Sequence, residues 1–129
     1  MKNKIIAISI FTLFLIALCV FEALITCSTV DKVKTTNYEV IELAYNDEET
    51  EMQLYDRLEK MGKFWAEREN YLCLIFNHKD MVEIGKEIEQ AKSYLKLNNK
   101  NEAIVHLELL AEDILSMEHI LYFNMPNLF

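Results

Sequence analysis

The sequence predicts an all-α protein, in which an N-terminal transmembrane helix precedes a small bundle of about four helices arranged as two helical hairpins. Three observations support this fold class. The 129-residue chain contains only 2 Gly and 1 Pro, so residues that break helices are scarce. A long apolar run lies near the N-terminus, and the residues after it repeat apolar side chains every three or four positions. The expected parts are a membrane anchor at 1–27, a linker at 28–35, a helical domain at 36–124 and a tail at 125–129.

The anchor is the apolar run Ile5–Ile25, in which Glu22 is the only charged residue. At about 1.5 Å per residue, this run would form a helix of roughly 32 Å, enough to cross a hydrocarbon core of about 30 Å. Lys2 and Lys4 precede the run, and positively charged flanks remain on the cytoplasmic side. The sequence therefore predicts a single span of the cytoplasmic membrane, with the N-terminus inside and the helical domain outside.

Two alternatives to an uncleaved anchor remain at the level of sequence. A cleaved signal sequence has a shorter apolar core and a small-residue cleavage site, which this run lacks. A lipoprotein signal ends in a small residue followed by a lipidated cysteine, and Leu24–Cys27 has this outline, although Thr26 is a poor residue before the cysteine. Cys27 is thus the candidate lipidation site. Glu22 lies near the end of the run, where its carboxylate is expected to reach the outer interface.

The remainder of the chain is acidic. Of the 21 Asp and Glu residues only Glu22 precedes residue 28, and of the 13 Lys and Arg residues only Lys2 and Lys4 do, so 28–129 carries 20 acids against 11 bases and a formal charge of −9. This balance disfavours nucleic acid and anionic lipid as partners. Cys73 is the only cysteine after residue 27, so no intramolecular disulfide is expected there, and its apolar surroundings predict a small buried side chain.

The first two helices of the domain are expected on either side of a polar break at 46–49. The capping-box pattern Thr36–Glu39 predicts the start of the first helix. Its apolar face would carry Tyr38, Ile41 and Tyr45. The second helix should extend to about Asn77, with only Arg68 interrupting its apolar stripe. That stripe comprises Leu54, Leu58, Met61, Trp65, Leu72 and Ile75.

Two further helices complete the predicted bundle, separated by a tight turn at Asn98 and Asn99. Asp80 is expected to cap the third helix, and the fourth should begin at Asn99 or Asn101 and end before Pro126. The apolar stripe of the third helix comprises Met81, Ile84, Ile88, Ala91 and Leu95. That of the fourth comprises Ala103, Leu107, Leu110, Ile114, Met117 and Leu121.

A single anchor, an acidic helical segment and the stretch from Trp65 through the Leu72–His78 block to Ala103 together resemble domain of unknown function family 4363. The positions that carry the resemblance are Trp65, Leu72, Ile75, His78, Tyr94 and Ala103. The chain departs from the family pattern at Tyr71, where a second tryptophan is commoner, and in its apolar tail. The resemblance implies a short membrane-anchored helical protein of the cell envelope of spore-forming bacteria, with no established activity or catalytic residue.

The sequence contains no recognisable catalytic or metal-binding motif. His78, His106 and His119 are far apart and do not form a His-Glu-x-x-His or Glu-x-x-His pattern. The acidic run Asn46–Glu51 lacks the glycine and the spacing of an EF-hand, so a solvated turn is expected. No cofactor or metal is predicted. His78 is expected to fix the corner after the second helix, and Trp65 to fill the core.

These features predict a membrane-anchored interaction or accessory module and not an enzyme. Its expected partner is an integral membrane or envelope protein, and sporulation is the process at which the resemblance hints. The exposed acids Glu48, Glu49 and Glu51 are expected to contribute to partner capture. The alternatives are a lipoprotein or helical ligand-binding domain and, from a different class, a hydrolase or metal-dependent enzyme, which would need a cleft with convergent polar groups. The sequence leaves the oligomeric state open.

Overall fold

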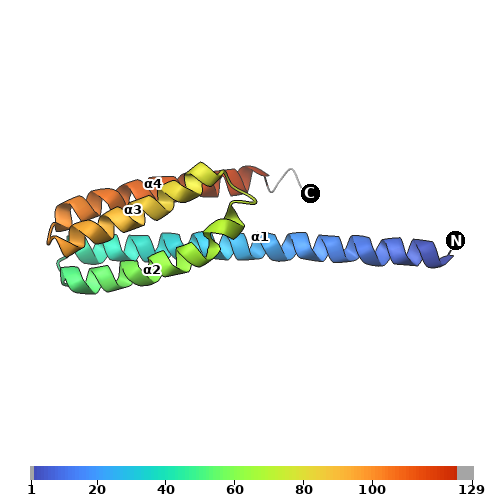
Figure 1. Cartoon of the computed structure of the whole chain (residues 1–129), viewed down its shortest axis with the longest axis horizontal. Helices are drawn as coiled ribbons and strands as arrows, with labels where there is room; N and C mark the ends of the chain where they lie inside the picture. The colour runs from blue at the N-terminus through green and yellow to red at the C-terminus, as the bar shows by residue number, and fades with distance from the viewer. Residues whose placement is uncertain (1, 125–129) are drawn as a thin grey trace.

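The computed structural model describes residues 2–124 and consists of four helices, α1 (Lys2–Tyr45), α2 (Glu51–Leu72), α3 (His78–Lys96) and α4 (Lys100–Asn124). Short turns join α1 to α2, α2 to α3 and α3 to α4, so consecutive helices are antiparallel. Each helix packs against two others, and the N-terminal half of α1 projects alone from the bundle (Figure 1). This confirms the predicted all-α fold with one long apolar N-terminal helix.

Helix α1 runs without a break through the segment expected to be a linker. Residues 28–35 are helical, and Val30 and Val33 are 3% and 1% exposed, so the expected linker is wrong. Thr36–Glu39 lies inside α1 and does not start a helix. The reason is tertiary, because one face of this segment is buried against the bundle. That face carries Thr29, Val30, Val33, Asn37, Val40 and Ala44.

The buried face of α1 also differs from the expected one. Tyr38 and Tyr45 are 45% and 60% exposed, and Ile41 is half-buried at the edge of the core. Asn37 is instead fully buried, and its Nδ2 donates a hydrogen bond of 2.9 Å to the carbonyl oxygen of Leu107 on α4. Two tyrosines with hydroxyl groups can remain at the water interface, while the smaller Val40 and Ala44 allow close helix contact.

Helix α2 begins with a complete capping box and ends earlier than expected. The side chain of Thr50 accepts from the backbone N–H of Gln53, and the side chain of Gln53 accepts from the backbone N–H of Thr50. The helix ends at Leu72, not near Asn77, because the chain then turns so that Phe76 enters the core at 6% exposure. Ile75 consequently leaves the apolar stripe and is 45% exposed.

Asparagines occupy the N-cap of α3 and the turn before α4. Asn77, and not Asp80, caps α3, since its side chain accepts a hydrogen bond of 3.0 Å from the backbone N–H of Lys79. In the turn before α4, Asn98 adopts a φ of 53°, a left-handed conformation that asparagine tolerates better than most residues. Helix α4 is described as far as Asn124, and Pro126 with the tail 125–129 lies outside the described residues.

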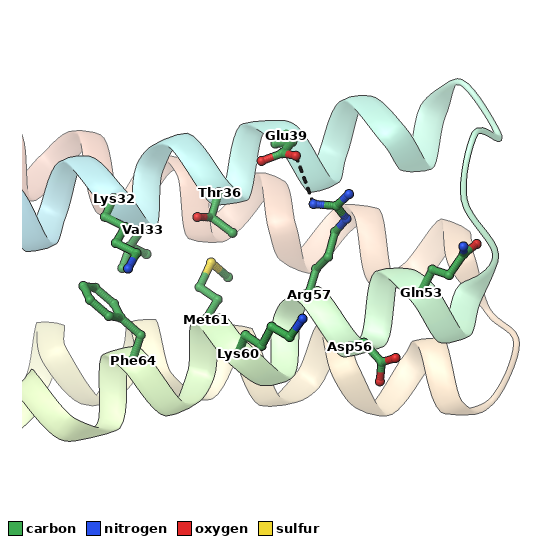
Figure 2. Close-up of a pocket in the computed structure, with 10 residues that line it drawn as sticks. All are labelled: Lys32, Val33, Thr36, Glu39, Gln53, Asp56, Arg57, Lys60, Met61 and Phe64. Carbon is green, nitrogen blue, oxygen red and sulfur yellow. Dashed lines mark hydrogen bonds and ion pairs between the residues drawn. The ribbon is translucent and has the colours of Figure 1, made fainter.

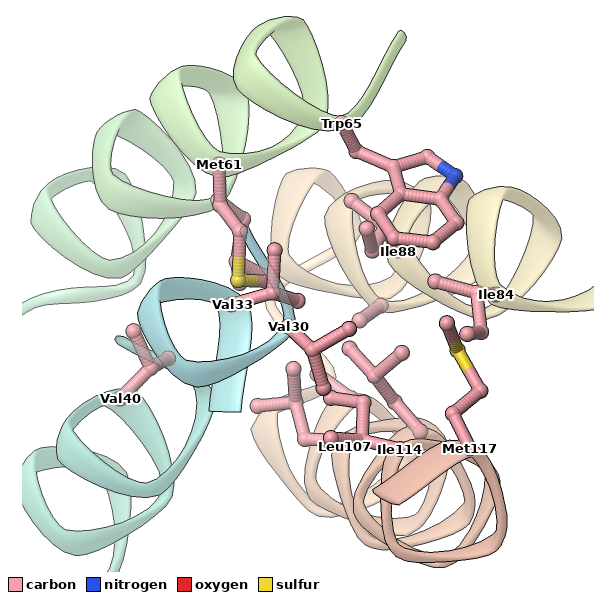
Figure 3. Close-up of a cluster of buried hydrophobic side chains, with 14 of the residues drawn as sticks. Val30, Val33, Val40, Met61, Trp65, Ile84, Ile88, Leu107, Ile114 and Met117 are labelled. Carbon is pink, nitrogen blue, oxygen red and sulfur yellow. The ribbon is translucent and has the colours of Figure 1, made fainter. Parts of the chain in front are cut away.

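The four helices share one apolar core, in which the stripes predicted for α2, α3 and α4 meet the buried face of α1 (Figure 3). Trp65 is 2% exposed and packs among side chains from α3. With the exception of Ile75 and the half-buried Leu121, every residue predicted on these three stripes is buried. The bundle therefore completes its own core without the projecting part of α1.

Candidate interaction surfaces

The projecting half of α1 is an uncovered apolar surface. Among the residues that the structure describes, α1 is the one helix long and apolar enough to cross a membrane, and its most apolar window has no buried residue. Leu13 and Leu24 are 71% and 65% exposed. A helix with these properties near the N-terminus fits a single-pass anchor or a signal sequence.

A groove of about 560 Å³ lies between α1 and α2 on the bundle itself. Figure 2 shows Lys32 and Glu39 reaching it from α1, and Arg57 and Lys60 from α2. Arg57 donates two hydrogen bonds of 2.7 Å to the carboxylate of Glu49 and one of 3.0 Å to Glu39. These hydrogen bonds lower the pKa of Glu49. The wall of the groove thus carries both positive and negative charges. Arg57 is already hydrogen-bonded to two carboxylates, and Lys60 is a second cation of α2 that lines the groove.

Phe64 and Lys32 line the end of this groove nearest the projecting helix (Figure 2), and two cations lie against the Phe64 ring. The Nζ atom of Lys32 lies 4.2 Å from the centroid of the Phe64 ring, and the guanidinium carbon of Arg68 lies 3.8 Å from it. Both distances are within the range of a cation–π interaction. Arg68, which interrupts the apolar stripe of α2 in sequence, therefore covers an aromatic side chain instead of entering the core.

Glu49 differs in role from its acidic neighbours in the α1–α2 turn. Its carboxylate side chain is 17% exposed and fixes Arg57, whereas Glu48 is exposed. Glu51 occupies the first turn of α2, where a negative charge favours the helix dipole. Three acids were expected to capture a partner. Of these, Glu48 is the one that, within residues 2–124, neither forms an ion pair nor lies in the first turn of a helix.

The sequence-predicted family positions separate into core and surface. Trp65, Leu72 and Ala103 are 2%, 0% and 1% exposed, so they support packing. Tyr94 is half-buried, and its ring stacks on His106 with centroids 5.2 Å apart. Ile75 and His78 are exposed in the α2–α3 corner.

The α2–α3 corner also holds Cys73, which was expected to be buried. It is half-buried, and its Sγ atom lies 3.2 Å from Nδ1 of His78. His78 is the first residue of α3, so it fixes the corner from the third helix and does not cap the second. Cys27 is half-buried beside a groove between α1 and α4, which Leu24 and Leu121 also line.

Sequence reasoning missed a polar cluster between α3 and α4. Glu87 is 5% exposed, and its Oε2 atom lies 2.6 Å from Nδ1 of His106. The pKa of the nearby Asp113 is raised. Burial is the largest cause, and the negative charges of Glu87, Glu83, Asp80 and Glu112 add to it. The 19-residue separation of Glu87 and His106 offers no motif, although both fall on the inward edge of an amphipathic stripe. Among the described residues, no group of three or more His, Cys, Asp or Glu side chains could hold a metal ion.

Comparison with known proteins places the chain in a family by its sequence. No curated protein and no solved structure matches it. The sequence profile described as Domain of unknown function (DUF4363) matches residues 24–128, which includes the end of the apolar run and the whole described bundle. The protein therefore belongs to the DUF4363 family.

Proposed function

We propose that this protein is a single-pass, membrane-anchored interaction module, with its N-terminus in the cytoplasm and its helical bundle on the outer face of a bacterial cytoplasmic membrane. It binds an integral membrane or envelope protein and carries out no catalysis. The observation that carries the proposal is the continuity of α1, which joins an uncovered apolar segment to a bundle whose core is already complete.

Tethering through α1 favours binding because it confines the bundle to a thin layer next to other membrane proteins. A tethered module meets its partner at a high effective concentration without further contacts. Since 28–129 carries a formal charge of −9, its field attracts a basic partner surface and speeds association at low salt. The unpaired carboxylate of Glu48 belongs to this acidic surface.

The positions of two histidines support binding over catalysis. His106 is held by Glu87 and by the ring of Tyr94, so its imidazole contributes to the packing of α3 against α4. His78 lies at the start of α3 beside Cys73, and within the described part of the chain it forms no ion pair with a carboxylate that would orient it as a base. In the proposed role, both side chains stabilise structure.

Orientation is tested first, with reporter domains fused after Phe129. A reporter that is active only outside the cytoplasm should be active, and a reporter that is active only inside should be silent. The reverse pattern would overturn the proposed topology. Mass spectrometry of the membrane-extracted protein should find an intact N-terminus, whereas loss of residues 1–26 with lipid attached to Cys27 would identify a lipoprotein.

Partner capture is tested by placing a photo-crosslinking residue at Asn46, beside Glu48, in the full-length protein within its native membranes. Glu48→Lys should reduce the yield of the specific adduct several-fold, and high salt should reduce the adduct of the unmodified chain in the same way. Glu67→Lys, an equal change of charge at an exposed site on α2, is the matched control and should retain the adduct. Equal losses with both variants would contradict capture by the acidic turn.

The enzyme alternative is tested with histidine variants, by measuring both the yield of the same crosslinked adduct and function in a complementation assay. His78→Gln and His106→Gln should retain function wherever the variant melts as the wild type does. A folded histidine variant that captures its partner and yet abolishes function would overturn the binding-only proposal.

A further inference from the structure

The α2–α3 corner lies beside the point where α1 leaves the bundle. Helix α2 runs antiparallel to α1, so its C-terminal end returns along α1 towards the projecting segment (Figure 1). Tyr71, one residue before the end of α2, is close enough to Glu22 for the carboxylate charge to raise the pKa of the tyrosine, after the larger effect of burial. The corner 73–77 therefore lies level with the last turns of the apolar run.

This corner is a hydrogen-bonded turn that exposes two apolar side chains. Leu74 and Ile75 are 79% and 45% exposed. Backbone N–H groups of Leu74 and Ile75 donate to the carbonyl oxygens of Tyr71 and Leu72 at 3.1 and 3.0 Å, and Phe76 is buried on the inner side. Two large apolar side chains are thus held outward by a hydrogen-bonded turn.

Phe21 and Leu24, in the last turns of the apolar run of α1, are also exposed, at 62% and 65%. The α1–α2 turn at the opposite end of the bundle is polar and acidic by contrast, with the sequence Asn-Asp-Glu-Glu-Thr at 46–50. The exposed apolar corner therefore occurs at the end of the bundle from which the membrane-spanning part of α1 emerges.

We propose that the α2–α3 corner inserts Leu74 and Ile75 into the outer leaflet of the same bilayer that α1 crosses, so that the bundle sits directly on the membrane. This inference rests on the proposed anchor. If Ile5–Ile25 fills the hydrocarbon core, its outer boundary lies near Glu22, and the corner, which lies along the same part of α1 (Figure 1), is at the depth of the headgroups and the first methylene groups. The unbroken α1 holds the corner at this depth, and lipid removes both side chains from water.

The insertion gives the bundle a fixed orientation. The bundle is then attached to the membrane at two points, because α1 crosses the bilayer and the α2–α3 corner enters its outer leaflet. The end of the bundle that contains this corner faces the membrane. Helix α2, with 22 residues at about 1.5 Å each, then carries the α1–α2 turn roughly 33 Å from the surface. Glu48 would be presented at this outer tip, away from the lipid headgroups.

The test uses spin labels on the full chain in phosphatidylcholine vesicles. Three leucines of similar exposure serve as label sites in a Cys19→Ala, Cys27→Ala, Cys73→Ala background, namely Leu13 (71%), Leu74 (79%) and Leu97 (74%). Leu13 reports the span, and Leu97, in the turn between α3 and α4, is the matched control at the far end of the bundle. The ratio of collision rates with oxygen and with a water-soluble nickel chelate measures depth, because oxygen concentrates in lipid and the chelate is excluded from it.

The ratio at Leu74 should exceed that at Leu97 several-fold and stay below that at Leu13, which lies near the middle of the apolar run. If Leu13 reports lipid while Leu74 matches Leu97, the insertion is wrong and the anchor stands. If Leu13 reports water, the anchor itself is wrong. A Leu74 label shielded from both reagents would show that protein covers the corner, either a second copy or a partner, and would also overturn the lipid proposal. A label at Ile75 repeats the measurement if the melting curve of the Leu74 variant departs from that of the background chain.

Discussion

Glu87 of α3 and His106 of α4 form a buried pair with 2.6 Å between the carboxylate Oε2 and the ring Nδ1. Glu87 is 5% exposed, so its carboxylate has little access to water, and the ring nitrogen of His106 replaces that solvation. The ring of Tyr94 stacks on a face of the imidazole and limits its movement. The pair therefore fixes the register between the two helices of the second hairpin.

His106→Ala should lower the free energy of unfolding by about 1–3 kcal/mol, because it leaves a buried carboxylate without its partner. His78→Ala is the control, since His78 is exposed, and should change stability much less. Urea denaturation followed by circular dichroism measures both. A double variant that also carries Glu87→Ala should lose less stability than the sum of the two single changes, and strict additivity would contradict the coupling.

Trp65→Ala should lower the free energy of unfolding by about 3–5 kcal/mol, since Trp65 is 2% exposed in the core shared by all four helices. Met52→Ala, on the same helix at 70% exposure, should change it by no more than about 0.5 kcal/mol. Chemical denaturation of the full chain in detergent provides the comparison. Equal stability of the two variants would show that Trp65 does not support this core.

The continuity of α1 predicts a narrow distance distribution between spin labels at Leu13 and Tyr38. For a straight helix, the 25 intervening steps give about 37 Å between the two backbones. Ser28→Pro should shorten and broaden this distribution, because proline removes a helical hydrogen bond and clashes with the preceding turn. Ser28→Ala is the matched control at this exposed position. A distribution that is already broad in the unmodified chain would support a flexible linker.

Asp113→Asn should stabilise the bundle at neutral pH. A carboxyl whose pKa is higher in the folded than in the unfolded state loses folding free energy when it ionises, so the penalty at Asp113 is complete above its folded pKa. The advantage of the variant should shrink as the pH falls towards the ordinary value of 3.8 and vanish below it. Added salt should also reduce it, since the charges of Glu83 and Asp80 contribute to the shift.

Thermal melts of Asp113→Asn and wild type across this pH range measure the effect. Glu112→Gln, a neighbouring acid that is exposed, provides a control with the same change in net charge. An advantage for Asp113→Asn that persists below pH 3.8, or one that Glu112→Gln reproduces in full, would contradict the burial of Asp113 as its source.

The amino-acid sequence was sufficient for the fold class and for most of the core. On α3, the spacing of Met81, Ile84 and Ile88 placed these residues on one face of a helix, and each of the three is buried. Such a prediction works because the period of an α-helix depends only on residues that are close in sequence. An apolar stripe with this period is stable only when it is buried against another surface. The apolar run of α1 was recognisable for a similar reason, since its length and composition need no tertiary information.

The candidate surfaces depended on contacts that sequence does not display. Ile75 continues the stripe of α2 by spacing, yet it is exposed because burying Phe76 ends the helix at Leu72. Local signals likewise suggested that a helix starts at Thr36, whereas the burial of Val33 and Asn37 against the bundle keeps α1 unbroken.

What the sequence determined by itself was the all-α class, the long apolar N-terminal helix and most of the apolar residues that face inward on α2, α3 and α4. Only the tertiary structure decided that α1 continues from its apolar run into the bundle, that Glu87 meets His106, and that Leu74 and Ile75 are exposed. The physical reason is that helical periodicity arises from neighbouring residues, whereas helix ends and polar partners depend on which groups distant segments bring into contact.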